Sequence, residues 1–189
     1  MTKGERVAIR AQARRTAILQ AGPSAGALSW SQAVAFETER KFLVADDSWR
    51  VQARERRTLR QGYLAIDGAT TVRIRTDGTE AWITIKGAHE GLTRPEFEYA
   101  VPVGDAEALL GLCGGRLVEK IRHLVAFDGK VWEVDEFLGA NHGLVVAELE
   151  LSGPDEIFGR PDWLGAEVSG DPRYLNSSLS LRPYANWAV

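Results

Sequence analysis

From residue 36 onward, apolar and polar residues alternate in short runs that glycine-containing turns separate. Successive side chains of a β-strand point to opposite faces, so this alternation predicts strands. Asp-Gly pairs at 67–68, 77–78 and 128–129 are typical of tight turns between antiparallel strands. The predicted strands are residues 36–44, 59–66, 71–76, 81–87, 96–101, 116–127, 130–137 and 144–151.

Helix signals stand beside or between these strands. Ser48 and Asp105 are capping residues ahead of short helical runs, and Ser152 with Pro154 is a typical helix start. The helices predicted from these signals are residues 48–57, 105–113 and 154–164. Asp171-Pro172-Arg173-Tyr174 predicts a further turn or short helix.

Residues 1–34 differ from the rest of the chain. A helix rich in Ala, Arg and Gln is predicted over residues 5–20, and a Ser/Ala/Gly stretch follows it. We therefore divide the chain into a basic helical arm with a linker, residues 1–34, and a domain, residues 35–189. The arm is either a loosely held appendage or a tether for an acidic partner or membrane surface.

Eight predicted strands with short links favour an antiparallel sheet. Such a sheet closes into a barrel, or pairs into two layers, because exposed strand edges invite aggregation. The predicted fold class is α+β, an eight-stranded antiparallel closed β-barrel with a few peripheral helices.

The predicted strands carry charges on one face and apolar side chains on the other. Residues i and i+2 of a strand share a face, and that rule groups like charges on strand after strand. Glu37 and Glu39 share a face with Lys41, and Arg73 shares one with Arg75. The remaining members of the charged faces are Lys86, Glu96, Glu98, Lys120, Arg122, Glu133, Asp135, Glu148 and Glu150.

Two interpretations fit the charged faces. They are a solvated outer surface, which antiparallel sheets often have, or the lumen of a barrel. Like charges at positions i and i+2 lie about 7 Å apart and repel by about 2 kcal/mol at an effective dielectric constant near 20. Counter-ions would offset that cost, and the opposite, apolar faces need burial. Both points favour the charged lumen.

A charged lumen indicates a particular class of ligand. Clustered carboxylates bind divalent cations, and a set of oxygen ligands suits Mg2+ or Mn2+. Clustered Lys and Arg side chains bind polyanions. A metal-bound di- or triphosphate satisfies both sets. The chain has no Walker A loop and no GxGxxG motif, so phosphate sites of those two kinds are absent from the sequence.

Charge and composition narrow the function classes. The net charge is -3, and residues 1–34 carry five cations against Glu5, or +4, which leaves -7 for residues 35–189. An acidic domain argues against nucleic-acid binding. No apolar stretch is long enough for a membrane span, and no signal peptide is evident, so a cytoplasmic location is expected. Cys113, the single cysteine, is expected to be a buried structural thiol.

Nine blocks in order resemble one family. Glu37-Thr38-Glu39-Arg40-Lys41 resembles the ExExK signature of the CYTH superfamily, the triphosphate tunnel metalloenzymes. The other eight blocks lie at residues 61–64, 72–75, 84–86, 94–99, 119–122, 132–135, 147–150 and 170–174, so the resemblance covers residues 35–184.

The resemblance implies a site as well as a fold. It implies that triphosphate is gripped by Lys41, Arg73, Arg75, Lys86, Lys120 and Arg122, with Arg173 over one mouth. It implies that Mg2+ or Mn2+ is held by Glu37, Glu39, Asp135, Glu148 and Glu150. Glu96, Glu98 and Glu133 would be further tunnel acids. In short bacterial members a Tyr and a Lys at the positions of Tyr63 and Lys86 are implicated in catalysis.

The resemblance leaves several reactions open. The length and the paired Gln-Gly-Tyr-Leu and Thr-Ile-Lys blocks resemble the bacterial tripolyphosphatases, so hydrolysis of inorganic tripolyphosphate by in-line water attack is the expected activity. The alternatives are an adenylate cyclase of the class IV type and a non-catalytic binder of polyphosphate or nucleotides. The expected partner is a small-molecule triphosphate, without nucleic acid or membrane, for a monomer or homodimer.

Overall fold

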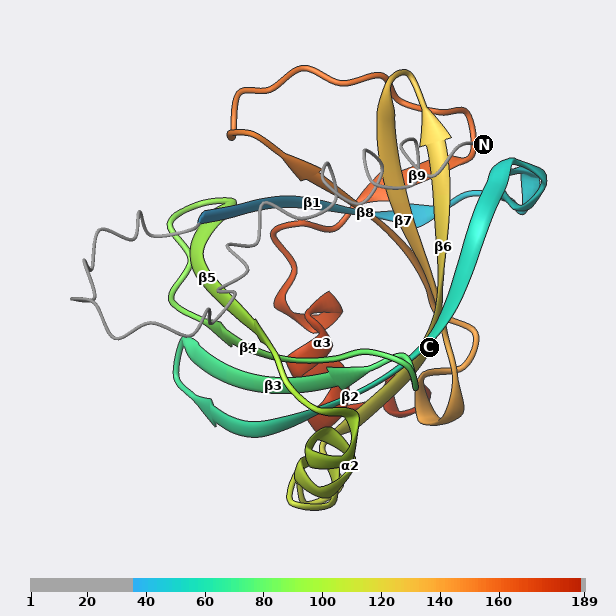
Figure 1. Cartoon of the computed structure of the whole chain (residues 1–189). Helices are drawn as coiled ribbons and strands as arrows, with labels where there is room; N and C mark the ends of the chain where they lie inside the picture. Colours follow the sequence, from blue (N-terminus) through green and yellow to red (C-terminus); the bar gives the residue numbers. More distant parts are fainter. Residues whose placement is uncertain (1–35, 188–189) are drawn as a thin grey trace, which may run out of the picture.

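The computed structural model describes residues 36–187, and its strands form a closed barrel (Figure 1). The strands are β1 (Phe36–Val44), β2 (Ala53–Asp67), β3 (Thr70–Thr76), β4 (Ala81–Lys86), β5 (Thr93–Ala100), β6 (Leu117–Phe127), β7 (Lys130–Phe137), β8 (Val145–Leu151) and β9 (Leu164–Glu167). Neighbouring strands are antiparallel in the order β5-β4-β3-β2-β6-β7-β8-β1-β9, and pairing of β5 with β1 closes the ring. The predicted eight-stranded antiparallel barrel is confirmed, with β9 as an extra strand on β1.

The helical elements are short. They are η1 (Ser48–Gln52), α2 (Val103–Gly111), η2 (Gly139–Asn141), η3 (Pro172–Tyr174), α3 (Asn176–Leu181) and η4 (Tyr184–Asn186). None of the helices in residues 36–187 is long and apolar enough to span a bilayer. The predicted arm and its helix over residues 5–20 lie outside the described residues.

Three helix predictions need correction. The helix predicted over 48–57 ends at Gln52, because residues from Ala53 onward pair with β6. Asp105 lies inside the first turn of α2 instead of capping it, since the helix starts at Val103. The helix predicted over 154–164 does not form.

Side chains around the segment 154–164 explain why it is not helical. The Ser152 amide and hydroxyl both donate to the Glu156 carboxylate, which also accepts from Lys130, so the helix-start signal closes a turn. Trp163 is buried against the barrel wall, and Phe158 packs against Phe42 and Trp132 of the same cluster. Long-range burial of these two rings outweighs the local helix signal.

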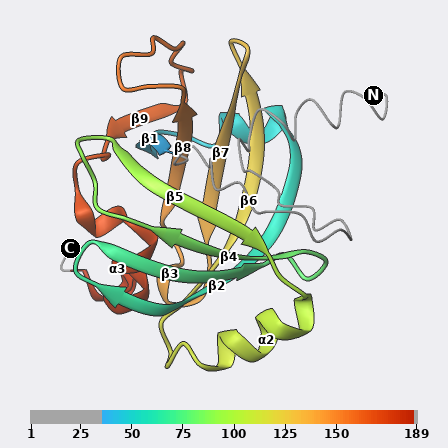
Figure 2. The same cartoon turned by 60° about the vertical axis from the view of Figure 1, so that its left-hand side comes forward.

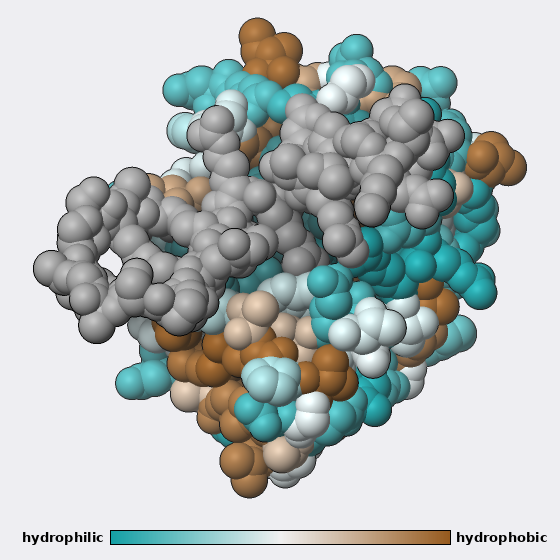
Figure 3. Space-filling view, viewed as in Figure 1, coloured by the Kyte–Doolittle hydropathy of each residue, from teal (hydrophilic) through white to brown (hydrophobic). Residues whose placement is uncertain are grey.

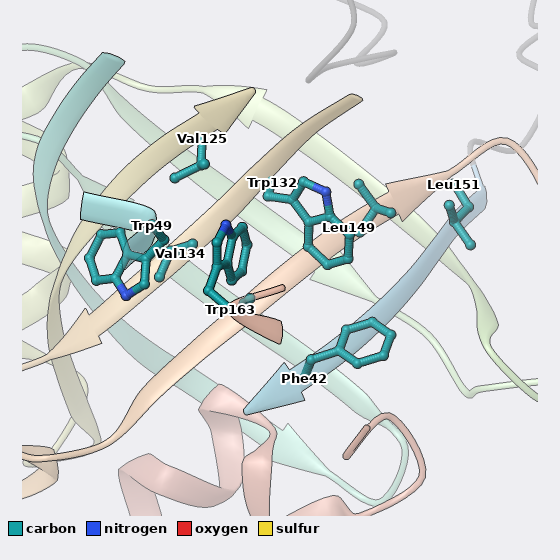
Figure 4. Close-up of a cluster of buried hydrophobic side chains, with 9 residues drawn as sticks. Phe42, Trp49, Val125, Trp132, Val134, Leu149, Leu151 and Trp163 are labelled. Atoms are coloured by element: carbon teal, nitrogen blue, oxygen red, sulfur yellow. The ribbon is translucent and has the colours of Figure 1, made fainter. Parts of the chain in front are cut away.

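The outer wall of the barrel is the apolar one. Phe42, Trp132, Val134 and Leu149 point outward from β1, β7 and β8 into one cluster (Figure 4). Trp49 from η1 and Trp163 from the chain before β9 cover this cluster, with the Trp132 and Trp163 rings edge to face at 5.7 Å. On the opposite wall, α2 packs over Ile74 and Ala81, and Cys113 is buried there as predicted (Figure 2). Apolar burial on the outside leaves the inner face for polar groups.

One end of the lumen is apolar and is filled by the C-terminal segment. Val118, Phe137 and Val146 share inner strand faces with Lys120, Asp135 and Glu148, as the i and i+2 rule requires. These three side chains pack with Leu179 of α3. In Figure 1, α3 lies across the opening of the ring of strands, and Figure 2 shows it at one end of the barrel. The charged part of the lumen therefore ends at α3.

Candidate functional site

The strand registers bring the predicted lumen charges onto one inner surface. Residues directly opposite each other on paired strands point to the same side of the sheet. Lys41 lies opposite Glu148, Arg122 opposite Asp135, and Lys86 opposite Glu96. The inner surface carries two kinds of charge. Its carboxylates are Glu37, Glu39, Glu96, Glu98, Glu133, Asp135, Glu148 and Glu150, and its cations are Lys41, Arg73, Arg75, Lys86, Arg94, Lys120 and Arg122. We call these fifteen residues the lumen charges.

One group of lumen charges surrounds Glu37. Lys86 Nζ donates to both Glu37 oxygens, at 2.7 and 2.9 Å, and Arg94 Nε donates to Oε2 at 2.9 Å. Glu96 lies 3.4 Å from the same Lys86 nitrogen. Burial alone would raise the pKa of Glu37, but Lys86 and Arg94 hold it well below its ordinary value. Glu37 is therefore a permanent anion in the absence of ligand.

A second group surrounds Glu98. Arg75 Nη2 and the Thr84 hydroxyl each donate to Glu98 Oε2 at 2.9 Å. Arg73 Nη2 donates to Thr84 Oγ1 at 3.0 Å and lies 3.6 Å from the same carboxylate oxygen. Two guanidinium groups thus converge on one carboxylate. This group has more positive than negative charge, which favours the binding of an anion beside it.

The third and largest group joins β1, β6, β7 and β8. Arg122 donates to Asp135 at 2.6 and 2.7 Å and to Glu148 at 2.7 Å, and it also pairs with Glu133. Lys41 pairs with Glu148. Burial would raise the pKa of Glu148, but its cationic neighbours hold that pKa well below its ordinary value, so the carboxylate is ionised. Lys120 pairs with Asp135 deep in the lumen. Burial and the neighbouring Arg122 lower the pKa of Lys120 to about 8.

Glu39 and Glu150 differ from the other lumen carboxylates. Burial, and then the nearby Glu148, raise the pKa of Glu39 to about 7, although Lys41 lies 2.7 Å away. Partial desolvation and four neighbouring carboxylates, first among them Glu37, raise the pKa of the more exposed Glu150 to about 8. In the part of the chain that the structure describes, Glu150 has no ion pair. This corner of the lumen has an excess of negative charge.

The remaining predicted site residues are placed differently. Tyr63 is buried opposite Arg73, and burial raises its pKa. No hydrogen bond among residues 36–187 joins Tyr63 to Lys86. Arg173 is not brought into the lumen: its guanidinium is exposed and donates to Asp171 at 2.6 Å. Trp82, which the sequence did not assign to the site, lies buried opposite Arg75, whose guanidinium carbon is 5.3 Å from the centre of the indole ring.

Sequence reasoning missed polar residues of the inner surface, among them Arg94, Thr84 and Gln61. Arg94 shares a strand face with Glu96, but it fell in a stretch predicted as a loop. Thr84 shares a face with Lys86 on β4, and Gln61 precedes Tyr63 by two residues on β2. The i and i+2 rule, applied to uncharged residues as well, would have found the last two.

The donor types of the lumen suit a divalent cation, although their present orientations do not form a site. Within residues 36–187, no three acidic, histidine or cysteine side chains are placed to hold an ion. Every lumen carboxylate except Glu150 is instead turned toward a lysine or arginine. The oxygen-only donor set and the raised pKa values of Glu39 and Glu150 fit Mg2+ or Mn2+ once these ion pairs open.

Comparison with known proteins gives consistent matches. The CYTH domain model matches residues 35–184. Two proteins named inorganic triphosphatase are similar to the chain. The one from Acetivibrio thermocellus is 46% identical over 152 residues, 80% of this chain and 97% of that protein. The one from Nitrosomonas europaea is 38% identical over 149 residues, 77% of this chain and 97% of that protein.

Solved structures agree with the barrel. A crystal structure of an inorganic triphosphatase superposes with a TM-score of 0.56 at 37% identity, covering 77% of this chain and 94% of that one. A conserved hypothetical protein from Pyrococcus furiosus has a TM-score of 0.50 at 16% identity, covering 63% of this chain and 80% of that one, and supports the fold alone.

Proposed function

The chain belongs to the CYTH domain family, and on that premise we propose that it is a divalent-metal-dependent triphosphatase whose substrate is inorganic tripolyphosphate. The family match spans most of the chain, and two relatives, each matched over 97% of its length, carry the name inorganic triphosphatase. The proposal includes a cytoplasmic site of action and assembly as a monomer or homodimer.

The near balance of lumen charges carries this proposal. Eight carboxylates face seven cations, and every cation is already paired with a carboxylate. A polyphosphate that binds these cations displaces their carboxylate partners. The displaced carboxylates then need positive charge, because buried like charges repel strongly. A polyanion accompanied by divalent cations satisfies both halves of the lumen, whereas a bare polyanion satisfies one.

We assign phosphate binding to the lumen cations. Arg73 and Arg75 present two guanidinium groups to one carboxylate, a geometry that also suits adjacent phosphate oxygens. Lys41, Lys86, Lys120 and Arg122 complete the set inferred from sequence, and Arg94 joins it on structural grounds. Arg173 joins only when its pair with Asp171 opens.

We assign the metal to the carboxylates released in that exchange, Glu37, Glu39, Asp135, Glu148 and Glu150. Mg2+ or Mn2+ bound there would neutralise phosphate charge and polarise phosphoryl oxygens. Glu96, Glu98 and Glu133 remain as further acids around the substrate. Phosphoryl transfer mainly requires positioning and charge neutralisation, which these two sets of residues supply.

Tyr63 and Lys86 are the proposed catalytic residues. Lys86 Nζ lies between Glu37 and Glu96, so that one group can hold a phosphate oxygen while a neighbouring carboxylate orients water. Tyr63 lies beside Arg73 and keeps its proton, because burial raises its pKa. A neutral hydroxyl donates a hydrogen bond to a phosphate oxygen without adding charge. In-line attack by water on a terminal phosphorus then releases phosphate.

A phosphate-release screen tests the proposal. Tripolyphosphate, ATP, GTP and thiamine triphosphate are each supplied with Mg2+ or with Mn2+, and we expect release to be fastest from tripolyphosphate. Abundant cyclic AMP formed from ATP would contradict the hydrolase assignment and show that the protein is an adenylate cyclase. Tight tripolyphosphate binding without phosphate release would replace the hydrolase assignment with that of a non-catalytic binder.

A further inference from the structure

Gln61 is a buried polar side chain that the assignments above leave unused. Its exposed fraction is 1%, and neither its Nε2 nor its Oε1 has a hydrogen-bonding partner among the described residues. A buried carboxamide without partners loses its hydrogen bonds to water and gains none in exchange. An apolar side chain of the same size would fill the space without that loss, so the amide indicates a ligand.

The strand registers place this amide on the inner surface. On β2, Gln61 lies opposite Arg75 of β3 and opposite Val118 of β6, and both partners point into the barrel. Gly62, the next residue, faces outward, since a Cβ atom there would lie 2.6 Å from the Cys113 sulfur beside α2. Gln61 therefore points into the lumen, as does Tyr63, two residues further along.

Its neighbours place Gln61 at the boundary between the two parts of the lumen. Arg75 belongs to the Glu98 group of lumen charges. Val118 belongs to the apolar cluster that Leu179 of α3 completes. The carboxamide thus lies where the charged lumen meets α3, in the wall that one end of a bound phosphate chain would reach.

The amide offers something that the lumen cations do not. Each lumen cation is held by a carboxylate that an incoming phosphate must displace. The Gln61 amide has no such competitor in residues 36–187, so its N–H groups are available before any ion pair opens. A neutral donor also adds no charge that would need compensation.

We propose that Gln61 is a substrate-binding residue, whose Nε2 donates to a non-bridging oxygen of the phosphate nearest α3 and whose Oε1 accepts from a water on that phosphate. The inference rests on the proposed function for the identity of the phosphate chain. It assigns to Gln61 a neutral hydrogen-bond donor at the end of the substrate that lies against α3, beside Lys120, whose Nζ lies 3.4 Å from Asn176 Oδ1 of that helix.

Gln61→Met tests the proposal, because Met has nearly the same length and no amide. Leu59→Met is the matched control, since Leu59 is buried on the same strand face two residues away. We expect Gln61→Met to keep or raise the Tm, because an unpaired buried amide is removed, while kcat/KM for tripolyphosphate falls at least tenfold, mainly through KM. Leu59→Met should stay within twofold of wild type. Gln61→Glu should lower kcat/KM for tripolyphosphate further than Gln61→Met does, because the new carboxylate repels phosphate.

Two results would overturn the proposal. One is wild-type kcat/KM in Gln61→Met, whatever its Tm, which would mean that the amide holds only a structural water. The other is an equal rise in Tm when tripolyphosphate and Mg2+ are added to Lys86→Ala and to the double variant Lys86→Ala with Gln61→Met, in both of which turnover during the scan is slow. If Gln61→Met fails to fold, Gln61→Glu and Gln61→Leu undergo the same two measurements. The Tm measurement needs no turnover, so an inactive wild type would contradict the proposed function and still leave this inference decided.

Discussion

Glu39 of β1 and Glu150 of β8 lie directly opposite each other on the inner face of the barrel, two carboxylates on paired strands in the corner of greatest negative charge. Lys41 lies 2.7 Å from Glu39, and Glu148 adds a further carboxylate. The pair links the fold to the proposed chemistry, because the strand register that closes the barrel also creates this excess of negative charge. Glu39 is the more buried of the two, and its titration can be followed through the pH dependence of the free energy of unfolding.

The metal-free protein should lose stability as the pH rises from 6 to 8. The pKa of Glu39 is about 7 in the folded protein against an ordinary value of 4.5, so between these values the folded state binds more protons than the unfolded state. Glu39 alone therefore lowers the free energy of unfolding by about 1 kcal/mol over this window, and Glu150, with a pKa of about 8, acts in the same direction. Urea denaturation at several pH values in the presence of EDTA measures it.

Glu39→Gln is the control for that experiment, since an amide does not titrate. The free energy of unfolding of Glu39→Gln should change less with pH than that of the wild type, and the difference between the two slopes is the contribution of Glu39. Lys120 and other titrating groups contribute equally to both slopes and cancel. Equal slopes in the two proteins would show that Glu39 titrates normally in the folded state.

Metal and tripolyphosphate should stabilise the protein cooperatively. Each lumen cation that takes up phosphate releases a carboxylate, and each released carboxylate attracts the metal. We expect the rise in Tm with Mg2+ and tripolyphosphate together to exceed the sum of the two separate rises. Simple additivity in a protein slowed by Lys86→Ala, which avoids turnover during the scan, would argue against the exchange of partners.

Two arginines on paired strands should differ sharply in their importance. Arg73 is buried among the lumen charges, whereas Arg60 points outward and pairs with Glu107 of α2. Arg73→Ala should lower kcat/KM for tripolyphosphate by at least about 100-fold, the loss of roughly 3 kcal/mol of charge-assisted hydrogen bonding. Arg60→Ala removes an exposed ion pair worth at most about 1 kcal/mol and should leave turnover within twofold. Equal losses of kcat/KM in Arg73→Ala and Arg60→Ala would mean that phosphate does not bind in the lumen.

Trp163→Ala should destabilise the barrel without touching the lumen. The indole is buried against Trp132 in the outer-wall cluster that also contains Phe42. Removal of a buried tryptophan costs about 3–5 kcal/mol, and Trp163→Phe should cost less because part of the ring contact remains. Chemical denaturation gives both values. A loss under about 1 kcal/mol for the alanine variant would mean that this segment does not hold the outer core.

The space-filling view shows where the outer surface stays apolar. Apolar colour gathers on the lower part of the face in Figure 3, where Figure 1 places α2. Leu112 and Leu117, beside the end of α2, are both exposed. This patch lies outside the barrel and is separate from the lumen charges, which agrees with the division into an apolar exterior and a charged interior.

Local alternation carried most of the fold prediction. The strands predicted over residues 36–44 and 130–137 match β1 and β7 residue for residue. The sequence missed β9 and α3, because each is short and is held by distant contacts, β9 by pairing with β1 and α3 by Leu179 in the apolar cluster. The false helix over 154–164 had the same cause, since its signals were local and the burial of Trp163 was not.

The faces of the site residues were predictable, but their partners were not. Strand parity placed Glu37, Lys86 and Glu148 on the inner surface, as the structure does. Which carboxylate meets which cation depends on strand register across the barrel, and register is a property of the closed sheet. Arg94 was lost for a related reason, because the start of β5 is defined by its pairing with β1 and not by alternation.

Release of phosphate from tripolyphosphate with Mg2+, compared among the wild type, Glu39→Ala, Lys86→Ala and the outward-facing control Arg60→Ala, tests the central claim most directly. The account predicts rapid release by the wild type and by Arg60→Ala, and rates lower by orders of magnitude in both lumen variants, each with an intact fold by circular dichroism. Undetectable release by all four proteins, or wild-type rates in the lumen variants, would contradict it.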